Sequence, residues 1–221
     1  MRPGAPPTPP TASSQGDQHE PCATAISEAF LRHGARLLCR RRTTIYSAGG
    51  CADRVLYILR GVVRTSRVSA TGRREVGDFY GPGGVCGLEP SAERCFAAEG
   101  VTDCEFLVVL RYEIRADPQL QHVIDAAMRL ELARAQDHLS LLRRTGAREK
   151  VASFLTRLSG PHAASPVALP MGRQDVADFL GLTMETVSRV LSQFERDGVL
   201  RFAGPRQFEV QRPQVLAALA A

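Results

Sequence analysis

Glu185, Ser188 and Arg189 are the three polar side chains of this 221-residue chain whose types and spacing best suit recognition of a partner. Positions three and four apart are neighbours on one face of an α-helix, so the three side chains would lie together. Arginine can donate two hydrogen bonds to a guanine edge, and glutamate can accept one from the amino group of cytosine. The spacing therefore predicts a helix that reads base edges in a major groove, although an ordinary surface pair between Glu185 and Arg189 would share it.

A helix-turn-helix is the element that would present this polar face. Residues 173–180 have the apolar spacing of a short helix, and Gly181 follows, a residue that readily takes the left-handed backbone of a sharp turn. Thr183 is a good N-cap for a second helix, which we expect to run to Arg196. Its buried side would carry an aliphatic stripe, made of Val187, Val190 and Leu191.

The stretch 173–191 resembles the recognition element of the Crp/Fnr family of bacterial transcription regulators, in its Fnr and FixK branch. Glu185-x-x-Ser188-Arg189 is typical of that branch, whose DNA half-sites contain TTGA. The cyclic-AMP receptor branch differs, with Arg and Gly where this chain has Met184 and Ser188. The resemblance implies that Arg189 reads guanine, that Glu185 reads a cytosine or adenine amino group, and that Ser188 adds a contact at a neighbouring base pair.

A second set of polar residues lies at the helix starts and on a predicted wing, where contacts usually go to DNA phosphates and set the register. The set comprises Arg173, Gln174, Thr183, Thr186 and Arg206. Residues 199–210 predict a hairpin with Gly204-Pro205 at its tip. Together with the two helices, this hairpin predicts a winged helix-turn-helix domain over residues 145–221.

A long helix is predicted over residues 118–144, because apolar residues recur there at steps of three and four. The stripe is too broad to be covered from one side, which favours pairing with a second copy of the helix over an internal core helix of a monomer. The residues expected at this dimer seam are Leu132, Ala135, Leu139 and Leu142. We identified no acidic residue on this face that would oppose pairing across a two-fold axis.

Residues 22–117 are expected to form a sensory domain. Residues from about 22 to 40 suggest a helix, and from Thr44 to Arg111 short β-rich runs alternate with glycines, which is typical of a small barrel or sandwich. The region resembles the jelly-roll-like cyclic-nucleotide-binding fold of the same family. The predicted fold class is therefore α+β: a jelly-roll-like β-barrel, a dimerisation helix and a winged helix-turn-helix.

The sensory region departs from the pattern by which relatives hold cyclic nucleotides. There, an acid binds the ribose and a later Arg-Ser pair holds the phosphate. The matching stretches here are residues 84–88 and 93–95, in which Arg94 is retained, Val85 replaces the acid and Cys95 replaces the serine. Losing a partner for a buried hydroxyl costs on the order of 1–3 kcal/mol, so binding of cyclic AMP is disfavoured. Arg94 is then expected to be a surface or structural arginine.

An iron–sulfur cluster is the other sensor to test. A [4Fe–4S] centre needs four thiolates, usually three of them closely spaced. Cys104 lies about where the family's oxygen sensors carry their barrel cysteine, but Cys22 stands alone and Cys39 is far from it. Cys51, Cys86, Cys95 and Cys104 are expected to be small buried residues rather than ligands. No histidine spacing supports haem. The sequence thus predicts no cofactor, and an effector-free dimer; a regulator gated by nucleotide, haem or cluster is the alternative.

Composition fits this interpretation. The net charge of +5 suits an anionic partner such as double-stranded DNA. The Pro-rich segment 1–21 is too poor in apolar residues to order itself, and neither a secretion signal nor a membrane span is visible. We expect a cytoplasmic regulator. We do not expect an enzyme, because the resemblance covers about residues 22 to 215 and leaves no region for a catalytic domain. RNA polymerase is a further expected partner.

Overall fold

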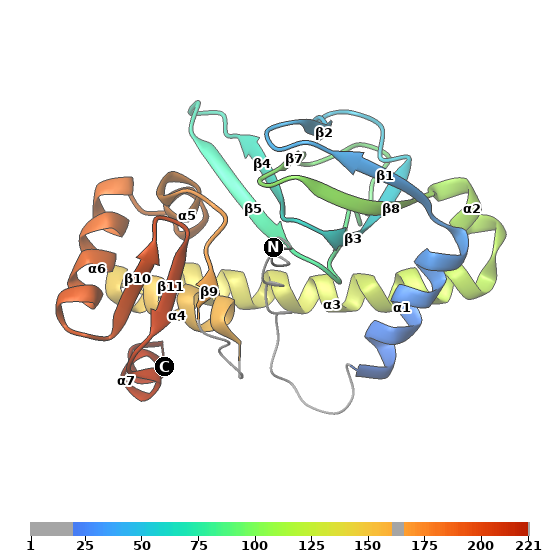
Figure 1. Ribbon diagram of the computed structural model, residues 1–221. Coiled ribbons are helices and arrows are strands. Elements are labelled where there is room, and N and C mark those ends of the chain that lie inside the picture. Colours follow the sequence, from blue (N-terminus) through green and yellow to red (C-terminus); the bar gives the residue numbers. More distant parts are fainter. Residues whose placement is uncertain (1–19, 161–165, 221) are drawn as a thin grey trace. The chain divides into compact units, whose positions relative to one another are not determined.

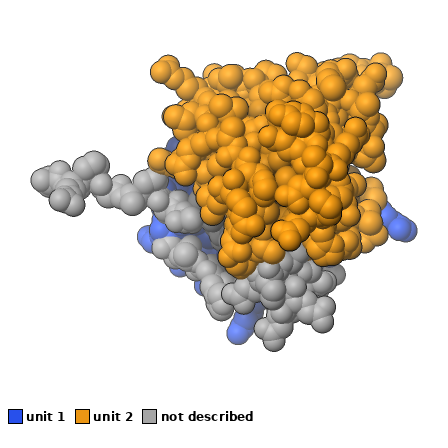
Figure 2. Space-filling view, turned by 90° about the vertical axis from the view of Figure 1, so that its right-hand side faces the viewer, with its two compact units in different colours: residues 1–14, 143–221 blue, residues 15–142 orange. Residues whose placement is uncertain are grey.

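The computed structural model describes residues 20–160 and 166–220. The described residues divide into two compact units, one up to residue 142 and one from residue 143 onwards (Figure 2). The expected disordered tail, residues 1–21, lies outside the described part except at its end. Helix α1 already begins at Glu20, inside the expected tail.

The described part of the first unit contains eight strands and three helices. Figure 1 labels them. Their bounds are α1 Glu20–His33, β1 Ala35–Cys39, β2 Thr44–Tyr46, β3 Arg54–Arg60, β4 Val63–Val68, β5 Arg74–Tyr80, β6 Val85–Cys86, β7 Ala97–Gly100, β8 Cys104–Leu110, α2 Arg111–Ala116 and α3 Pro118–Arg143, whose last residue falls in the second unit.

The strands form two four-stranded antiparallel sheets, in the orders β1-β8-β3-β6 and β2-β7-β4-β5. Strands of both sheets contribute to one buried cluster that includes Ile58, Val63, Ala98 and Phe106. The sequence predicts a barrel or a sandwich; among the described strands no ladder joins the two sheets, so the jelly-roll-like fold is a sandwich rather than a closed barrel.

The other face of the β1-β8-β3-β6 sheet is covered by helices. Phe30 of α1, Ile114 of α2, and Leu120 and Ile124 of α3 join Val109 of β8 in a second buried cluster. Alternation along β8 explains why one strand serves both clusters, since successive side chains point to opposite faces. The first half of α3 is thereby fixed to the sensory domain.

The predicted helix over residues 22 to 40 is wrong in its second half. Helix α1 ends at His33, and residues 35–39 form β1, which pairs along its whole length with β8. Gly34 marks the break, because a Cβ there would lie 2.6 Å from the carbonyl oxygen of Phe30 and 2.8 Å from Cβ of Leu107. Tertiary pairing with β8 therefore overrides the helical spacing of the sequence.

The second unit is the predicted winged helix-turn-helix. Its elements are α4 Ala147–Ser159, β9 Val167–Ala168, α5 Arg173–Leu180, α6 Met184–Arg196, β10 Leu200–Gly204, β11 Gln207–Val210 and α7 Pro213–Ala220. The three strands form one antiparallel sheet in the order β10-β11-β9. Phe154 of α4 and Phe179 of α5 pack with ring centroids 5.7 Å apart, which ties the helix-turn-helix to α4.

Candidate nucleic-acid interface

The turn between α5 and α6 has the geometry that the sequence predicts. Gly181 has φ 63° and ψ 35°, a left-handed conformation in which a side chain would be strained. The N–H of Leu182 returns to the carbonyl of Ala177 at 2.9 Å. Thr183 caps α6, because its hydroxyl accepts a 3.2 Å hydrogen bond from the Thr186 N–H. The Gly181 turn and the Thr183 cap thus set the direction of α6 relative to α5.

Helix α6 buries one side and exposes the other. Its core side chains are Val187, Val190, Leu191 and Phe194, which confirms the expected stripe. Glu185 and Arg189 are exposed and Ser188 is half-buried. Among the described residues no ion pair joins Glu185 to Arg189 and no hydrogen bond holds the Arg189 guanidinium, so the ordinary surface pair is not formed. Both side chains are exposed to solvent, where a partner can reach them.

Glu185 is prepared to act as an acceptor. Its own backbone N–H and the side chain of Thr183 hydrogen-bond its carboxylate, which lowers the pKa of Glu185 below the usual range. Its position in the first turn of α6 further favours the charged form, because the N-terminus of a helix carries a partial positive charge. A charged carboxylate can accept a hydrogen bond from a base amino group but cannot donate one.

The side chains predicted to contact phosphates already have intramolecular partners. The guanidinium of Arg173 lies 5.4 Å from the ring centroid of Phe202, on strand β10 of the wing. The Gln174 amide donates to Asp178 at 2.7 Å. Arg206, in the turn between β10 and β11, donates to the carbonyl of Pro170 at 2.8 Å. Arg173 therefore also links α5 to the wing.

The predicted dimer seam is exposed on α3. Leu132 and Leu139 are 61% and 62% exposed, Ala135 is exposed, and Leu142 is half-buried. Such large apolar side chains on one helix face are a characteristic feature of an interface.

Acidic Glu131, adjacent to the seam, faces the sensory domain instead. The Tyr80 hydroxyl donates to its carboxylate at 2.6 Å, and Arg134 pairs with Asp78 at 2.7 Å, so strand β5 engages these two charged residues of α3. Burial raises the pKa of Glu131, while nearby Arg134 opposes that shift. Sequence spacing alone gives no sign of this link, because its partners are more than fifty residues away.

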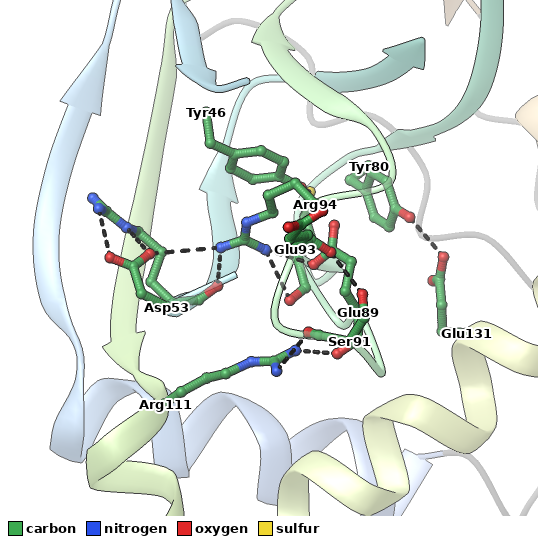
Figure 3. A network of polar contacts seen from close by, with 12 residues as sticks. Tyr46, Asp53, Tyr80, Glu89, Ser91, Glu93, Arg94, Arg111 and Glu131 are labelled. Atoms are coloured by element: carbon green, nitrogen blue, oxygen red, sulfur yellow. Dashed lines mark hydrogen bonds and ion pairs between the residues drawn. The ribbon is translucent and has the colours of Figure 1, made fainter. Parts of the chain in front are cut away.

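Arg94 is buried. Of the two roles expected for it, surface or structural, it therefore has the structural one (Figure 3). Its guanidinium pairs with the Glu89 carboxylate at 2.6 Å and donates to the carbonyl oxygens of Gly87 at 3.1 Å and Arg54 at 2.5 Å. It also lies over the Tyr46 ring, 4.1 Å from the centroid. The arginine that binds phosphate in the cyclic-nucleotide-binding pattern is therefore neutralised here by Glu89 of the same chain. The sequence pattern did not predict this acidic partner.

The loop that carries Glu89 is itself fixed. Arg111 donates to the backbone carbonyl oxygens of Glu89 and Ser91, and Asp53 lies 4.0 Å from Arg94 (Figure 3). The acid at position 89 is thus held toward the arginine by both its backbone and its side chain.

The cysteines whose side chains the structure describes form no metal site. Among the described residues no group of three or more His, Cys, Asp or Glu side chains could hold an ion. Cys86 and Cys104 are buried, as expected for small apolar residues, whereas Cys51 and Cys95 are exposed, which corrects that expectation for both. No helix in the described part of the chain is long and apolar enough to cross a membrane.

A winged helix-turn-helix with an exposed polar face on its second helix is the architecture of a DNA-binding protein. Comparisons with known proteins give the family. A family model of the Crp-like helix-turn-helix domain matches residues 149–219. FixK, the nitrogen fixation regulation protein of Azorhizobium caulinodans, is 39% identical over 184 residues, covering 79% of this chain and 74% of that protein. The transcriptional activatory protein AadR of Rhodopseudomonas palustris is 37% identical, covering 88% and 86%.

Solved structures agree with the sequence relatives. The structure of FixK2 from Bradyrhizobium japonicum matches with a TM-score of 0.79 and 37% identity, covering 85% of this chain and 98% of that chain. The protein belongs to the Crp/Fnr family of transcription regulators, within which it is FixK-like.

Proposed function

We propose that the protein is a homodimeric, sequence-specific activator that binds a palindrome of the form TTGA-N6-TCAA without an added effector. The observation that carries the proposal is the pair of charged side chains, Glu185 and Arg189, exposed and unpaired with each other on α6. In this proposal Arg189 reads guanine, Glu185 accepts from the adjacent amino group, and Ser188 contacts a neighbouring base pair. Arg173, Gln174, Thr183, Thr186 and Arg206 contact phosphates.

Dimerisation follows from α3. A seam with two leucines about 60% exposed would lose that exposure by packing against its own copy, and a two-fold arrangement would present two α6 helices to half-sites about one DNA turn apart. The operator should therefore be a palindrome. RNA polymerase is the proposed partner of an activator, and the cytoplasm is the proposed location.

Independence from an effector is supported by the Arg94–Glu89 pair, because a neutralised arginine offers no charge to a phosphate. A role in low-oxygen expression rests on similarity alone. Relatives include nitrogen fixation regulators and, at 26% identity, an anaerobic regulatory protein of Haemophilus influenzae.

The test is equilibrium binding of the purified protein, at fixed salt, to a TTGA-N6-TCAA duplex and to the same duplex with each G·C pair inverted. We expect at least about a thousandfold preference for the first duplex, with no ligand added. Arg189→Ala should lose much of that preference, whereas Arg196→Ala, which removes an exposed arginine from the last turn of α6, should keep it. Unselective binding by the wild type would refute the proposal and favour a ligand-gated regulator.

A further inference from the structure

Two cysteines lie directly opposite each other at the end of a β-ladder. Strands β1 and β8 lie side by side (Figure 1). In their pairing, Cys39 is the partner of Cys104, and this is the last pair of the ladder. Neither residue has a role in the proposed DNA recognition. Both are free thiols in this structure.

The backbone brings the two residues within reach of a disulfide. Residues directly opposite in an antiparallel pair have Cα atoms about 4.5–5.5 Å apart. Disulfides are found with Cα atoms about 4.4–6.8 Å apart, so neither strand has to change partner or register. Because the pair ends the ladder, small adjustments there disturb the fewest inter-strand hydrogen bonds.

Both side chains belong to the same face of the sheet. Cys104 and Phe106, two positions apart on β8, are buried in the cluster between the sheets, and Cys39 packs against that cluster. Room around the buried sulfur depends on a glycine, because a Cβ at Gly61 would lie 2.9 Å from the Cys104 sulfur.

The two thiols differ in access, and their present hydrogen bonds are weak. Cys39 is half-buried, and its thiol donates to carbonyl oxygens of the adjoining turn, at 3.4 Å to Arg40 and 3.7 Å to Thr43. Cys104 is 4% exposed, and its thiol donates to the carbonyl oxygens of Val62 at 3.3 Å and Thr102 at 3.2 Å. A reagent in solution can therefore reach Cys39 first.

We propose that Cys39 and Cys104 form a dithiol–disulfide couple that reacts with small disulfides of the oxidised-glutathione class. Cys39 loses its proton, attacks one sulfur of the reagent and forms a mixed disulfide, releasing one molecule of thiol. Cys104 then loses its proton and attacks the Cys39 sulfur, and a second thiol leaves. Two protein thiols are oxidised and one small disulfide is reduced to two thiols, so electrons balance.

The test uses the full chain with Cys22, Cys51 and Cys95 changed to serine, which leaves Cys86 as the only cysteine besides the proposed pair. The reduced protein is treated with oxidised glutathione at mildly alkaline pH, remaining thiols are alkylated, and peptides are mapped without reduction. We expect one intramolecular link between Cys39 and Cys104, two fewer alkylated thiols and no retained glutathione. Stable glutathione on Cys39 with alkylated Cys104, a link to another cysteine, or no reaction at Cys39 would overturn the proposal.

Two single variants assign the order of attack. Cys104→Ala should retain one glutathione on Cys39, because the resolving thiol is gone. Cys39→Ala should leave Cys104 unmodified and open to alkylation only on unfolding. The reverse pattern, with Cys104 modified first, would contradict the assigned order, and circular dichroism of the reduced variants controls for folding.

Discussion

Removing the carboxylate of Glu89 should destabilise the sensory domain strongly, because it leaves the Arg94 charge buried. The Arg94 side chain is 0% exposed and that of Glu89 is 12% exposed, so solvent screens this pair little. Breaking a buried pair by deleting one partner costs about 3–5 kcal/mol. Two carbonyl acceptors and Asp53, 4.0 Å away, remain for Arg94, which places Glu89→Ala near the lower end, at about 3 kcal/mol.

The assay is thermal and urea unfolding of the variant beside the wild type. About 3 kcal/mol corresponds to a drop in Tm of roughly 6–12 °C for a chain of this size. Glu93→Ala is the matched control, since Glu93 is an exposed acid on the same loop, and it should change stability by less than about 0.5 kcal/mol. Glu89→Gln should fall between the two, because it keeps a hydrogen-bond acceptor and loses the charge.

A double-mutant cycle separates the pair from the rest of the loop. If Glu89 and Arg94 neutralise each other, the double variant Glu89→Ala/Arg94→Met should cost well under the sum of the single changes, with a coupling of about 1–3 kcal/mol. Additive losses, or a Glu89→Ala variant as stable as Glu93→Ala, would refute the argument that an internal acid satisfies the arginine.

The other predictions concern DNA, the dimer and pH. Arg189→Ala should cost about 1–3 kcal/mol per half-site and relax selectivity at the guanine, as measured on duplexes changed at that base pair. Gln174→Ala should weaken binding to all sequences about equally, and an effect confined to one base pair would contradict a phosphate role. Leu139→Glu should raise the dimer dissociation constant at least about a hundredfold in sedimentation equilibrium, because it buries like charges at the seam. Folding raises the pKa of Glu131, so its contribution to stability is present below its unfolded pKa and is lost as pH rises through the folded pKa. The stability of Glu131→Gln relative to the wild type should therefore increase as pH rises from about 4.5. A stability difference that stays constant with pH would disprove this.

Local chemistry explains which parts of the fold the sequence predicts. The helix-turn-helix is recovered because Gly181 and the Thr183 cap are decided by neighbours within a few residues. Strand β1 is missed because its partner, β8, lies some seventy residues away and outweighs a helical pattern. The site follows the same division: the polar face of α6 follows from helical spacing alone, whereas the Glu89 partner of Arg94 depends on how a loop folds back.

Internal pairs in the sensory domain bear on how such a regulator can work without a ligand. A gated regulator exists in an active and an inactive conformation. An effector shifts the equilibrium between them only by as much as it binds one conformation more tightly than the other, so it must supply interactions that favour the active one. In the function proposed above, the chain supplies these interactions itself. Glu89 neutralises Arg94, and strand β5 holds α3 through Tyr80–Glu131 and Asp78–Arg134, beside the exposed leucines of the seam. We infer that the two pairs made by α3 fix the middle of this helix in one arrangement, so control of such a regulator would act on its amount or on covalent change rather than on effector binding.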